Sequence, residues 1–372
     1  MKKSLHILFS LLILNTALIS FSCSSKEAVP KVNEYSITVS PTLTMEVDEA
    51  YYCVSSICYL AGFEEYQLDS PFDHVCNAYL DKYKDDKAVK KAVAYYKKLR
   101  NTTVFEYDAP AQIAMCLSSD CHHWRADKKT IELNLKKAGR GHLIPFKNKI
   151  LKVTADFYDA TDFHDFYKGC SGYFDIYIAP YKDNIDIFNQ ALVSYRDFFH
   201  ITDTNPAIIK IGIYNAYGNY GTGFIQNGRT ILEPEYCIDT IAYGDPDVFV
   251  HEFCHTVVNP ALEKLAEDKD VKSCLDLILD EKRWEILRSN AYTTIQNYLN
   301  ELFVRASAIC IEENLVSKDY LDSCYQNNIG QGFDEIYWAV SVMKEYQASG
   351  AESFASYADT IRQKYADLSK ER

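Results

Sequence analysis

Two histidines and a glutamate at residues 251–255 have the types and the spacing that suit a metal-dependent reaction. They form the pattern His251-Glu252-Phe253-Cys254-His255. Residues four apart in a helix lie on one face about one turn, roughly 6 Å, apart, so both imidazoles can reach a single ion. Glu252 projects to the same side, where it can take a proton from a metal-bound water without being a ligand. The HExxH spacing therefore predicts a catalytic Zn²⁺ site.

The sequence around this pattern predicts the helix that positions it. Asp245 can cap a helix that begins at Pro246, and Asn259-Pro260 would end it. Apolar side chains occur nearly all round this helix, so we expect it to be buried. Cys254 faces away from the two histidines and is expected to lie in the core. The alternative interpretation is a buried helix whose two histidines are satisfied by hydrogen bonds alone.

A catalytic zinc needs a third protein ligand and an open position for water. A third histidine at the metzincin spacing is excluded, because Ala261 occupies its position. We therefore expect a carboxylate further along the chain. Glu301 is the first choice, because it lies in an apolar segment with Arg305 one turn later; a surface ion pair between these two residues is the alternative. Glu281 and Glu285 are competing candidates in a more charged segment.

Amide hydrolysis also places negative charge on the carbonyl oxygen, which needs a hydrogen-bond donor opposite the metal. Four residues are candidate donors, and the sequence does not choose among them: Arg305, Tyr298, Tyr337 and Tyr220. The chain has 29 tyrosines, so any one of them is more often a packing residue than a catalytic one.

The first 34 residues have the order of a lipoprotein leader. Lysines follow Met1 and an apolar stretch runs to Phe21, which predicts a signal peptide over residues 1–22. Ser22-Cys23-Ser24-Ser25 resembles a lipobox, so Cys23 is the expected lipidation site and residues 23–34 the tether. We expect a lipid-anchored protein of the bacterial cell envelope, on the periplasmic or outer surface; the alternative is a secreted protein cleaved near Ser22.

Charge and cysteine content limit the expected partners and linkages. A net charge of −13 disfavours nucleic acid and gives no attraction to anionic lipid, so membrane contact would come from the lipid anchor only. Two cysteine pairs, Cys53/Cys58 and Cys116/Cys121, are close enough in sequence to form local disulfides in an oxidising compartment. The alternative is that these cysteines are small buried apolar residues.

Hydrophobic periodicity divides the chain after the tether into two regions, 35–168 and 169–372. The first is expected to be mainly helical after a strand at 35–39. The second is expected to contain strands at 173–179 and 207–215 and a hairpin that turns at Asn227-Gly228. The first strand of that hairpin, 221–226, is expected to lie at a sheet edge and to bind an extended peptide in antiparallel orientation. Helices are predicted over 261–267, 271–289, 291–314, 333–349 and 352–369.

This order predicts a mostly helical α+β fold. A small sheet precedes the HExxH helix and a helical C-terminal lobe follows it, which is the order of elements in a zincin-like catalytic domain.

The residues quoted above resemble a known family. The segment 251–260, the segment Tyr217-Gly218-Asn219-Tyr220-Gly221 and the segment from Glu301 to Arg305 are similar to secreted bacterial proteins of the family called domain of unknown function 4932. They also resemble the wider gluzincin pattern of HExxH and a distal Glu. That resemblance implies a zinc peptidase with a thermolysin-like core, but it supplies no substrate. Many gluzincins carry an Asp four residues after the ligand Glu, whereas here the position is Arg305, so the residues that support this ligand must differ.

The expected function is hydrolysis of peptide bonds by a zinc metallopeptidase in which Glu252 activates the zinc-bound water. A cell-wall amidase is a further enzyme alternative. The alternative from another class is a non-catalytic surface lipoprotein with a structural metal that binds a peptide or glycan. The intact Glu252 favours an enzyme, because a structural zinc has no use for a general base.

Overall fold

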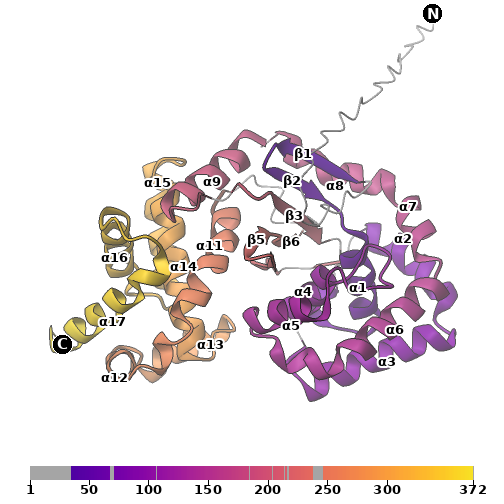
Figure 1. The fold of residues 1–372 in the computed structure, drawn as a ribbon, viewed down its shortest axis with the longest axis horizontal. Coiled ribbons are helices and arrows are strands. Elements are labelled where there is room, and N and C mark those ends of the chain that lie inside the picture. Colours follow the sequence, from indigo (N-terminus) through magenta and orange to yellow (C-terminus); the bar gives the residue numbers. More distant parts are fainter. Residues whose placement is uncertain are drawn as a thin grey trace, which may run out of the picture. The chain divides into compact units, whose positions relative to one another are not determined.

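The computed structural model describes residues 35–67, 71–105, 107–183, 185–202, 204–212, 214–215, 218–237 and 246–371 (Figure 1). The leader, Cys23, the tether, Tyr217 and the helix-capping Asp245 of the sequence analysis lie outside the described residues. Asn33–Arg372 pack as a single unit. The described part of this unit is mostly helical with one small mixed sheet, so the predicted α+β class is confirmed.

The sheet of the described residues contains both parallel and antiparallel strand pairs. Its strands are β1 (Ser36–Ser40), β2 (Leu43–Glu46), β3 (Ala207–Gly212), β4 (Gly223–Gln226), β5 (Arg229–Leu232) and β6 (Glu235–Cys237). The order is β1-β2-β3-β5-β4, and β6 continues beyond β5 along the same side of β3. β1 pairs antiparallel with β2, and β2 pairs parallel with β3. The strand β4 therefore lies at one edge of the sheet.

The predicted hairpin forms β4 and β5. Its two turn residues, Asn227 and Gly228, have φ angles of 53° and 78°, which is the left-handed conformation that a two-residue hairpin turn requires. Gln226 pairs with Arg229 directly across this turn.

Helices make up most of the rest of the described chain. In chain order the helices and 3-10 turns are α1 (Glu49–Leu60), η1 (Glu64–Tyr66), α2 (Pro71–Leu80), η2 (Asp81–Tyr83), α3 (Lys87–Thr102), α4 (Asp108–Cys116), α5 (Lys128–Lys137), η3 (Gly141–Phe146), α6 (Lys147–Ala160), α7 (Phe163–Gly169), α8 (Ser171–Asp183), α9 (Ile185–Phe198), α11 (Pro246–Leu262), η4 (Leu265–Glu267), α12 (Lys269–Ile278), α13 (Glu281–Ser289), α14 (Ile295–Glu312), α15 (Lys318–Gly330), α16 (Ile336–Ala348) and α17 (Phe354–Glu371). Within this part of the chain, none of the helices is both long and apolar enough to cross a bilayer.

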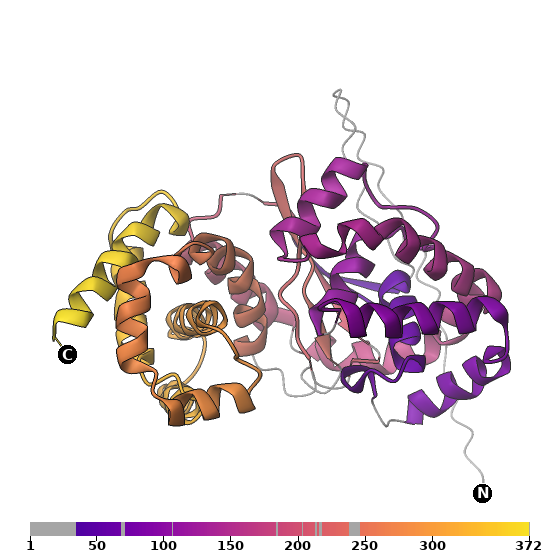
Figure 2. The same ribbon diagram turned by 90° about the horizontal axis from the view of Figure 1, so that it is seen from below.

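The two regions separated at residue 168 in the sequence analysis share the sheet. β1 and β2 come from the first region, and β3 to β6 come from the second. The helices α1 to α9 are thus inserted between β2 and β3, two strands that are direct neighbours. Figures 1 and 2 show α1 to α8 grouped on one side and α11 to α17 on the other, with α9 alongside the second group.

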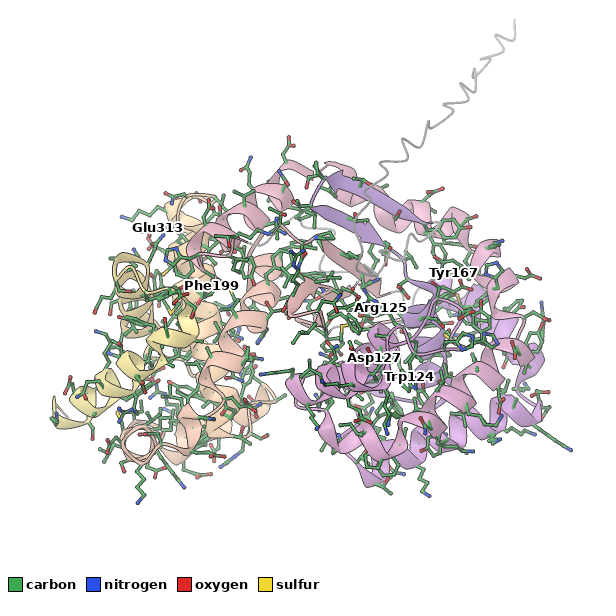
Figure 3. The ribbon with its side chains drawn as sticks, in the orientation of Figure 1. Trp124, Arg125, Asp127, Tyr167, Phe199 and Glu313 are labelled. Carbon is green, nitrogen blue, oxygen red and sulfur yellow. The ribbon has the colours of Figure 1, made fainter. Side chains whose placement is uncertain are left out.

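Aromatic residues fill the interior of both helix groups, which explains the high tyrosine content. In the first group, Tyr167 packs against Phe174 with ring centroids 5.1 Å apart. In the second, Phe199 contacts Tyr346 and Phe354. Figure 3 labels Tyr167 and Phe199 and shows how far apart the two clusters lie.

A buried ion cluster joins β2, β3 and the start of α1. The Lys210 ammonium of β3 is bonded to Glu46 of β2 and lies 2.9 Å from Asp48, and all three side chains are 2 % exposed. Arg125, labelled in Figure 3, forms an ion pair with buried Glu233 at 2.6 Å. A buried charge is tolerated only with a partner, so these pairs fix the alignment of the strands.

The strand predicted at 173–179 is wrong, because this segment lies within α8. An alternating strand would bury every second residue, yet Phe174 is fully buried while Ile176 is 65 % exposed. The buried pair is Cys170 and Phe174, which are four residues apart as on a helix face. A short alternating apolar run does not by itself distinguish a strand from a helix that packs on one side.

Several predicted helix boundaries also differ from the structure. α11 does not end at Asn259-Pro260 but continues to Leu262, because a proline near a helix end removes only one hydrogen bond. The helix predicted over 271–289 is two helices, and Asp280 caps the second by accepting a hydrogen bond from the Arg283 N–H. The sequence analysis did not predict the helix α15, because Asn328 is the only buried side chain of this helix.

The predicted local disulfides are wrong. Cys53, Cys58, Cys116 and Cys121 are free thiols and all four are buried. They fill the core as small apolar side chains, which was the alternative interpretation.

Candidate metal centre

The helices α11 and α14 pack directly against each other and bring together three side chains that could hold a metal ion. His251 and His255 come from α11, and Glu301 comes from α14. The Nε2 atoms of the two histidines are 3.2 Å apart. The Glu301 carboxylate lies 3.3 Å from Nε2 of His255 and 3.6 Å from Nε2 of His251. All three side chains are at most 20 % exposed.

These separations fit one small cation. Donor atoms that bind a tetrahedral Zn²⁺ at 2.0–2.1 Å lie about 3.3 Å from one another. The three measured distances, 3.2, 3.3 and 3.6 Å, are close to this value. Two imidazoles and one carboxylate are also a donor set found in catalytic zinc sites. The residues present therefore fit a zinc ion, with one coordination position left for another ligand.

The surroundings of the cluster favour the metal-binding protonation states of His251 and Glu301, whereas the raised pKa of His255 favours its protonated form, which a metal ion would have to displace. Burial lowers the pKa of His251 to about 3, which keeps this imidazole neutral. Burial alone would raise the pKa of Glu301, but His255, His251 and Arg305 outweigh burial and hold that pKa below its usual value. Burial alone would lower the pKa of His255, but Glu301 and Glu252 outweigh it and raise that pKa. A neutral imidazole and an ionised carboxylate are the metal-binding forms.

Arg305 positions Glu301 from one turn further along α14. Its Nε lies 3.3 Å from the Glu301 carboxylate. Its other nitrogens donate to Asn328 of α15 at 2.8 Å and to the Tyr292 hydroxyl at 2.9 Å. The guanidinium also lies over the Phe333 ring at 4.6 Å, a cation–π contact. Three of these contacts hold the guanidinium in place, and the fourth is to Glu301. The geometry is therefore consistent with the expectation that Arg305 supports Glu301.

Asn259 contacts the other ring nitrogen of His255. Its side-chain oxygen lies 3.2 Å from Nδ1, one turn further along α11. A hydrogen bond at Nδ1 leaves Nε2 as the nitrogen free to bind a metal and fixes the ring orientation. The spacing of four residues could have identified Asn259 from the sequence, but Asn259 was interpreted only as part of a helix end.

Glu252 lies beside the three donors, with a carboxylate oxygen within 4.8 Å of a ring nitrogen of each histidine. It is 6 % exposed, and burial raises its pKa to about 7. The main-chain N–H of Gly221 forms a hydrogen bond with its carboxylate. Gly221 is needed for this approach, because a Cβ there would lie 2.4 Å from the Glu252 carbonyl oxygen and 2.8 Å from Cβ of His255. A carboxylate whose pKa is near neutral suits a general base.

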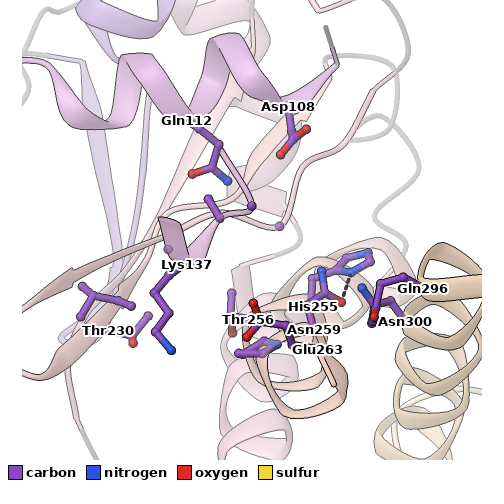
Figure 4. Close-up of a pocket in the computed structure, with 16 residues that line it drawn as sticks. Asp108, Gln112, Lys137, Thr230, His255, Thr256, Asn259, Glu263, Gln296 and Asn300 are labelled. Carbon is purple, nitrogen blue, oxygen red and sulfur yellow. Dashed lines mark hydrogen bonds between the residues drawn. The ribbon is translucent and has the colours of Figure 1, made fainter. Parts of the chain in front are cut away.

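A cavity of about 310 Å³ opens beside His255 (Figure 4). One wall comes from α4 and α5 and includes Asp108 and Lys137. The opposite wall comes from α11 and α14 and includes Asn300. Gly221, just before the edge strand β4, and Gly223, its first residue, also line the cavity. The volume is in the range of small-molecule and peptide subsites.

The four candidate donors differ in the residues that they contact. Of the four candidate donors, Arg305 is the one bonded to Glu301. The Tyr298 hydroxyl instead donates to buried Glu335 at 2.7 Å, and Tyr337 is 53 % exposed with its ring stacked on Tyr325. Tyr220 is 9 % exposed, with its hydroxyl close to Gly218.

The competing carboxylates are on the surface. Glu281 is 74 % exposed and pairs with Arg288, and Glu285 is also exposed. Of the three candidate carboxylates, only Glu301 contacts both histidines.

The sequence analysis missed Tyr292 and Asn328, which hold Arg305. They lie 13 and 23 residues from it along the chain, and no local spacing connects them. No family model, curated protein or solved structure matches this chain.

Proposed function

We propose that this chain is a zinc metallopeptidase with a zincin-like, gluzincin-type site that hydrolyses peptide bonds. His251, His255 and Glu301 hold the ion, and Glu252 is the general base. The single observation that carries the proposal is the convergence of three donor groups, 3.2–3.6 Å apart, with a buried glutamate next to them. The zinc assignment rests on the donor set and its spacing, since imidazole and carboxylate also bind other transition metals.

Two features favour a catalytic ion over a structural one. Structural zinc sites use four protein ligands, whereas here three donors converge and a cavity opens beside His255. The buried carboxylate of Glu252 has no role in a purely structural site. Its burial without a full charge partner is unfavourable, and such unfavourable arrangements are typical of catalytic groups.

The residues of this chain would share the work of the reaction. A bound zinc ion supplies Lewis acidity, which brings the pKa of a water to about 7 and polarises a carbonyl. Glu252 accepts the proton of the attacking water and can return it to the leaving amine. The Gly221 N–H orients Glu252, and Asn259 orients His255. Arg305 holds Glu301 and, after His255 and His251, helps to lower the pKa of its carboxylate.

A peptide is the substrate class that the surroundings favour. The edge strand β4 runs from the segment beside Glu252 along the cavity, and a sheet edge recognises an extended main chain with little dependence on side chains. Placement at the cell envelope through lipidated Cys23 remains part of the proposal on sequence grounds.

The test replaces the general base and leaves every metal donor in place. Glu252→Gln should keep stoichiometric zinc and lose turnover of a broad peptide library by several orders of magnitude. Glu281→Gln is the matched control, since Glu281 is exposed and pairs only with Arg288. Zinc-loaded wild-type protein that cleaves nothing in the library but binds one peptide or glycan tightly would favour the non-catalytic lipoprotein instead.

A further inference from the structure

Along the edge strand, only every second residue directs its N–H and C=O groups away from β5. The Glu233 N–H donates to the Thr222 carbonyl at 2.9 Å, so Thr222 faces β5. The pairing across the turn makes Gln226 and Phe224 face β5 as well. The residues between them, Gly221, Gly223 and Ile225, therefore direct their N–H and C=O groups away from β5, toward the position of an added strand.

A side chain from α5 already occupies the outward groups of Ile225. Asn134 accepts a hydrogen bond from the Ile225 N–H at 2.6 Å and donates one to the Ile225 carbonyl at 2.8 Å. Its second amide proton goes to the Thr130 carbonyl at 2.9 Å, and the residue is 2 % exposed. One donor and one acceptor side by side are what a residue of a neighbouring strand would offer. Asn134 thus replaces a strand partner at Ile225.

The helix behind Asn134 also fills the space of a neighbouring strand. A paired peptide would run about 4.8 Å from β4. The Asn134 amide is within 2.8 Å of the Ile225 main chain, and α5 packs against β4. A peptide cannot continue straight along β4 past this point.

Of the three outward N–H groups, only that of Gly223 has no partner among the described residues and is left for a substrate. At the metal end, the Gly221 N–H is bonded to Glu252. Gly223 lines the cavity, and its outward groups have no hydrogen-bond partner among the described residues. An antiparallel peptide can satisfy both groups with one residue, because a closely paired residue exchanges both of its hydrogen bonds.

The direction of the strand decides which part of the substrate is limited. β4 runs away from Glu252, from Gly221 toward Ile225, so an antiparallel peptide has its amino-terminal end at the blocked position. Gly223 is two residues from Gly221, about 7 Å along a strand. With the scissile bond of the peptide near Gly221, about two substrate residues fit on its amino-terminal side before α5 closes the path.

We propose that Asn134 makes this protein act close to the amino terminus of its peptide substrates, by blocking the edge strand beyond Gly223. The inference rests on the proposed peptidase function and adds a limit on substrate length. Asn134 is a specificity-determining residue in this proposal, with no part in the chemical step.

The first test needs no activity. Hydrogen exchange of the metal-loaded protein should show a protected Ile225 amide in wild type and at least about tenfold faster exchange in Asn134→Ala, which loses both bonds. Leu133→Ala is the matched control, because Leu133 is the adjacent α5 residue and is 41 % exposed. Unchanged exchange at Ile225 in Asn134→Ala, or equal acceleration in both variants, overturns the inference that Asn134 occupies the main chain of Ile225.

The second test uses a peptide that wild-type protein cleaves, extended one residue at a time at either end. Amino-terminal extension beyond about two residues before the scissile bond should lower kcat/KM at least about tenfold, since the added residues meet α5. Carboxyl-terminal extension should not lower it. Equal rates for both series, or a loss only on carboxyl-terminal extension, overturns the inference. If no peptide is cleaved, the proposed function fails, whereas the exchange experiment still decides whether Asn134 holds Ile225.

Discussion

Glu235 of β6 should make the stability of this protein fall as pH rises. The side chain is 1 % exposed, and neither carboxylate oxygen has a hydrogen-bond partner among the described residues. Burial, with a smaller contribution from Asp48, raises its pKa from 4.5 to about 8. Between these two pH values the folded protein holds a proton that the unfolded chain has released. Unfolding therefore becomes easier as pH rises through this range.

The size of the effect follows from the pKa shift. A shift of about 3.5 pH units at 1.36 kcal/mol per unit amounts to about 5 kcal/mol, a large part of the 5–15 kcal/mol by which a typical domain is stable. Glu235→Gln keeps the shape of the side chain and removes its charge. The free energy of unfolding of wild type, minus that of the variant, should fall by up to about 5 kcal/mol from pH 4.5 to pH 8 and then level off.

The assay is urea unfolding of chelator-treated wild type and Glu235→Gln at pH values from 4 to 9, followed by tryptophan fluorescence, with roughly half-unit steps. Groups that titrate equally in both proteins cancel in the difference. Glu313→Gln is the matched control, because Glu313, labelled in Figure 3, is half-exposed and its carboxylate lies 2.8 Å from the Lys344 ammonium. A difference for Glu235→Gln that stays constant within about 0.5 kcal/mol would mean that the carboxylate is ionised in the fold, and the reasoning from burial would be refuted.

Two further predictions concern the metal and the membrane. Glu301→Ala should lose zinc during dialysis against a chelator under conditions in which wild type keeps it, because the variant lacks one of three donors. Glu281→Ala and Glu285→Ala should keep the zinc. Metal analysis after dialysis measures this, and zinc retained by Glu301→Ala would exclude Glu301 as a ligand. Cys23→Ala should move the protein from the membrane fraction to the soluble fraction or stall its processing; unchanged fractionation with a mature amino terminus other than Cys23 would contradict lipidation.

The parts of the site that the sequence predicts are those fixed by local geometry. His251 and His255 lie on one face because a helix has 3.6 residues per turn, and Arg305 follows Glu301 for the same reason. Glu301 itself was identified from the apolar residues around it, and its carboxylate lies 3.3 Å from His255 and 3.6 Å from His251. Helix periodicity therefore identifies the candidate donor residues, but it does not give the distances between their side chains.

The residues that the sequence did not reveal depend on contacts between distant segments. Asn134 and Ile225 are 91 residues apart, and Asn328 lies on the helix α15 that periodicity missed. The strand wrongly assigned at 173–179 has the same cause, because the buried face of α8 is decided by the aromatic rings that pack on Phe174. Propensity is a weak predictor where such packing competes with it.

The pairing of β2 with β3 has a consequence for how the chain folds. Leu43 pairs with Ala207, and 164 residues separate them (207 minus 43). Closing a loop of this length costs about 4.5 kcal/mol of chain entropy, before any constant term, so the pairing is a slow, late step of high contact order. During synthesis from the amino terminus, β1 and β2 are complete long before β3 leaves the ribosome. Until then β2 has an open edge, and Glu46 and Asp48 lack the lysine that neutralises them. A nascent chain stopped before residue 207 would therefore expose an unpaired strand edge to other chains, so aggregation of truncated products is the characteristic failure expected of this topology.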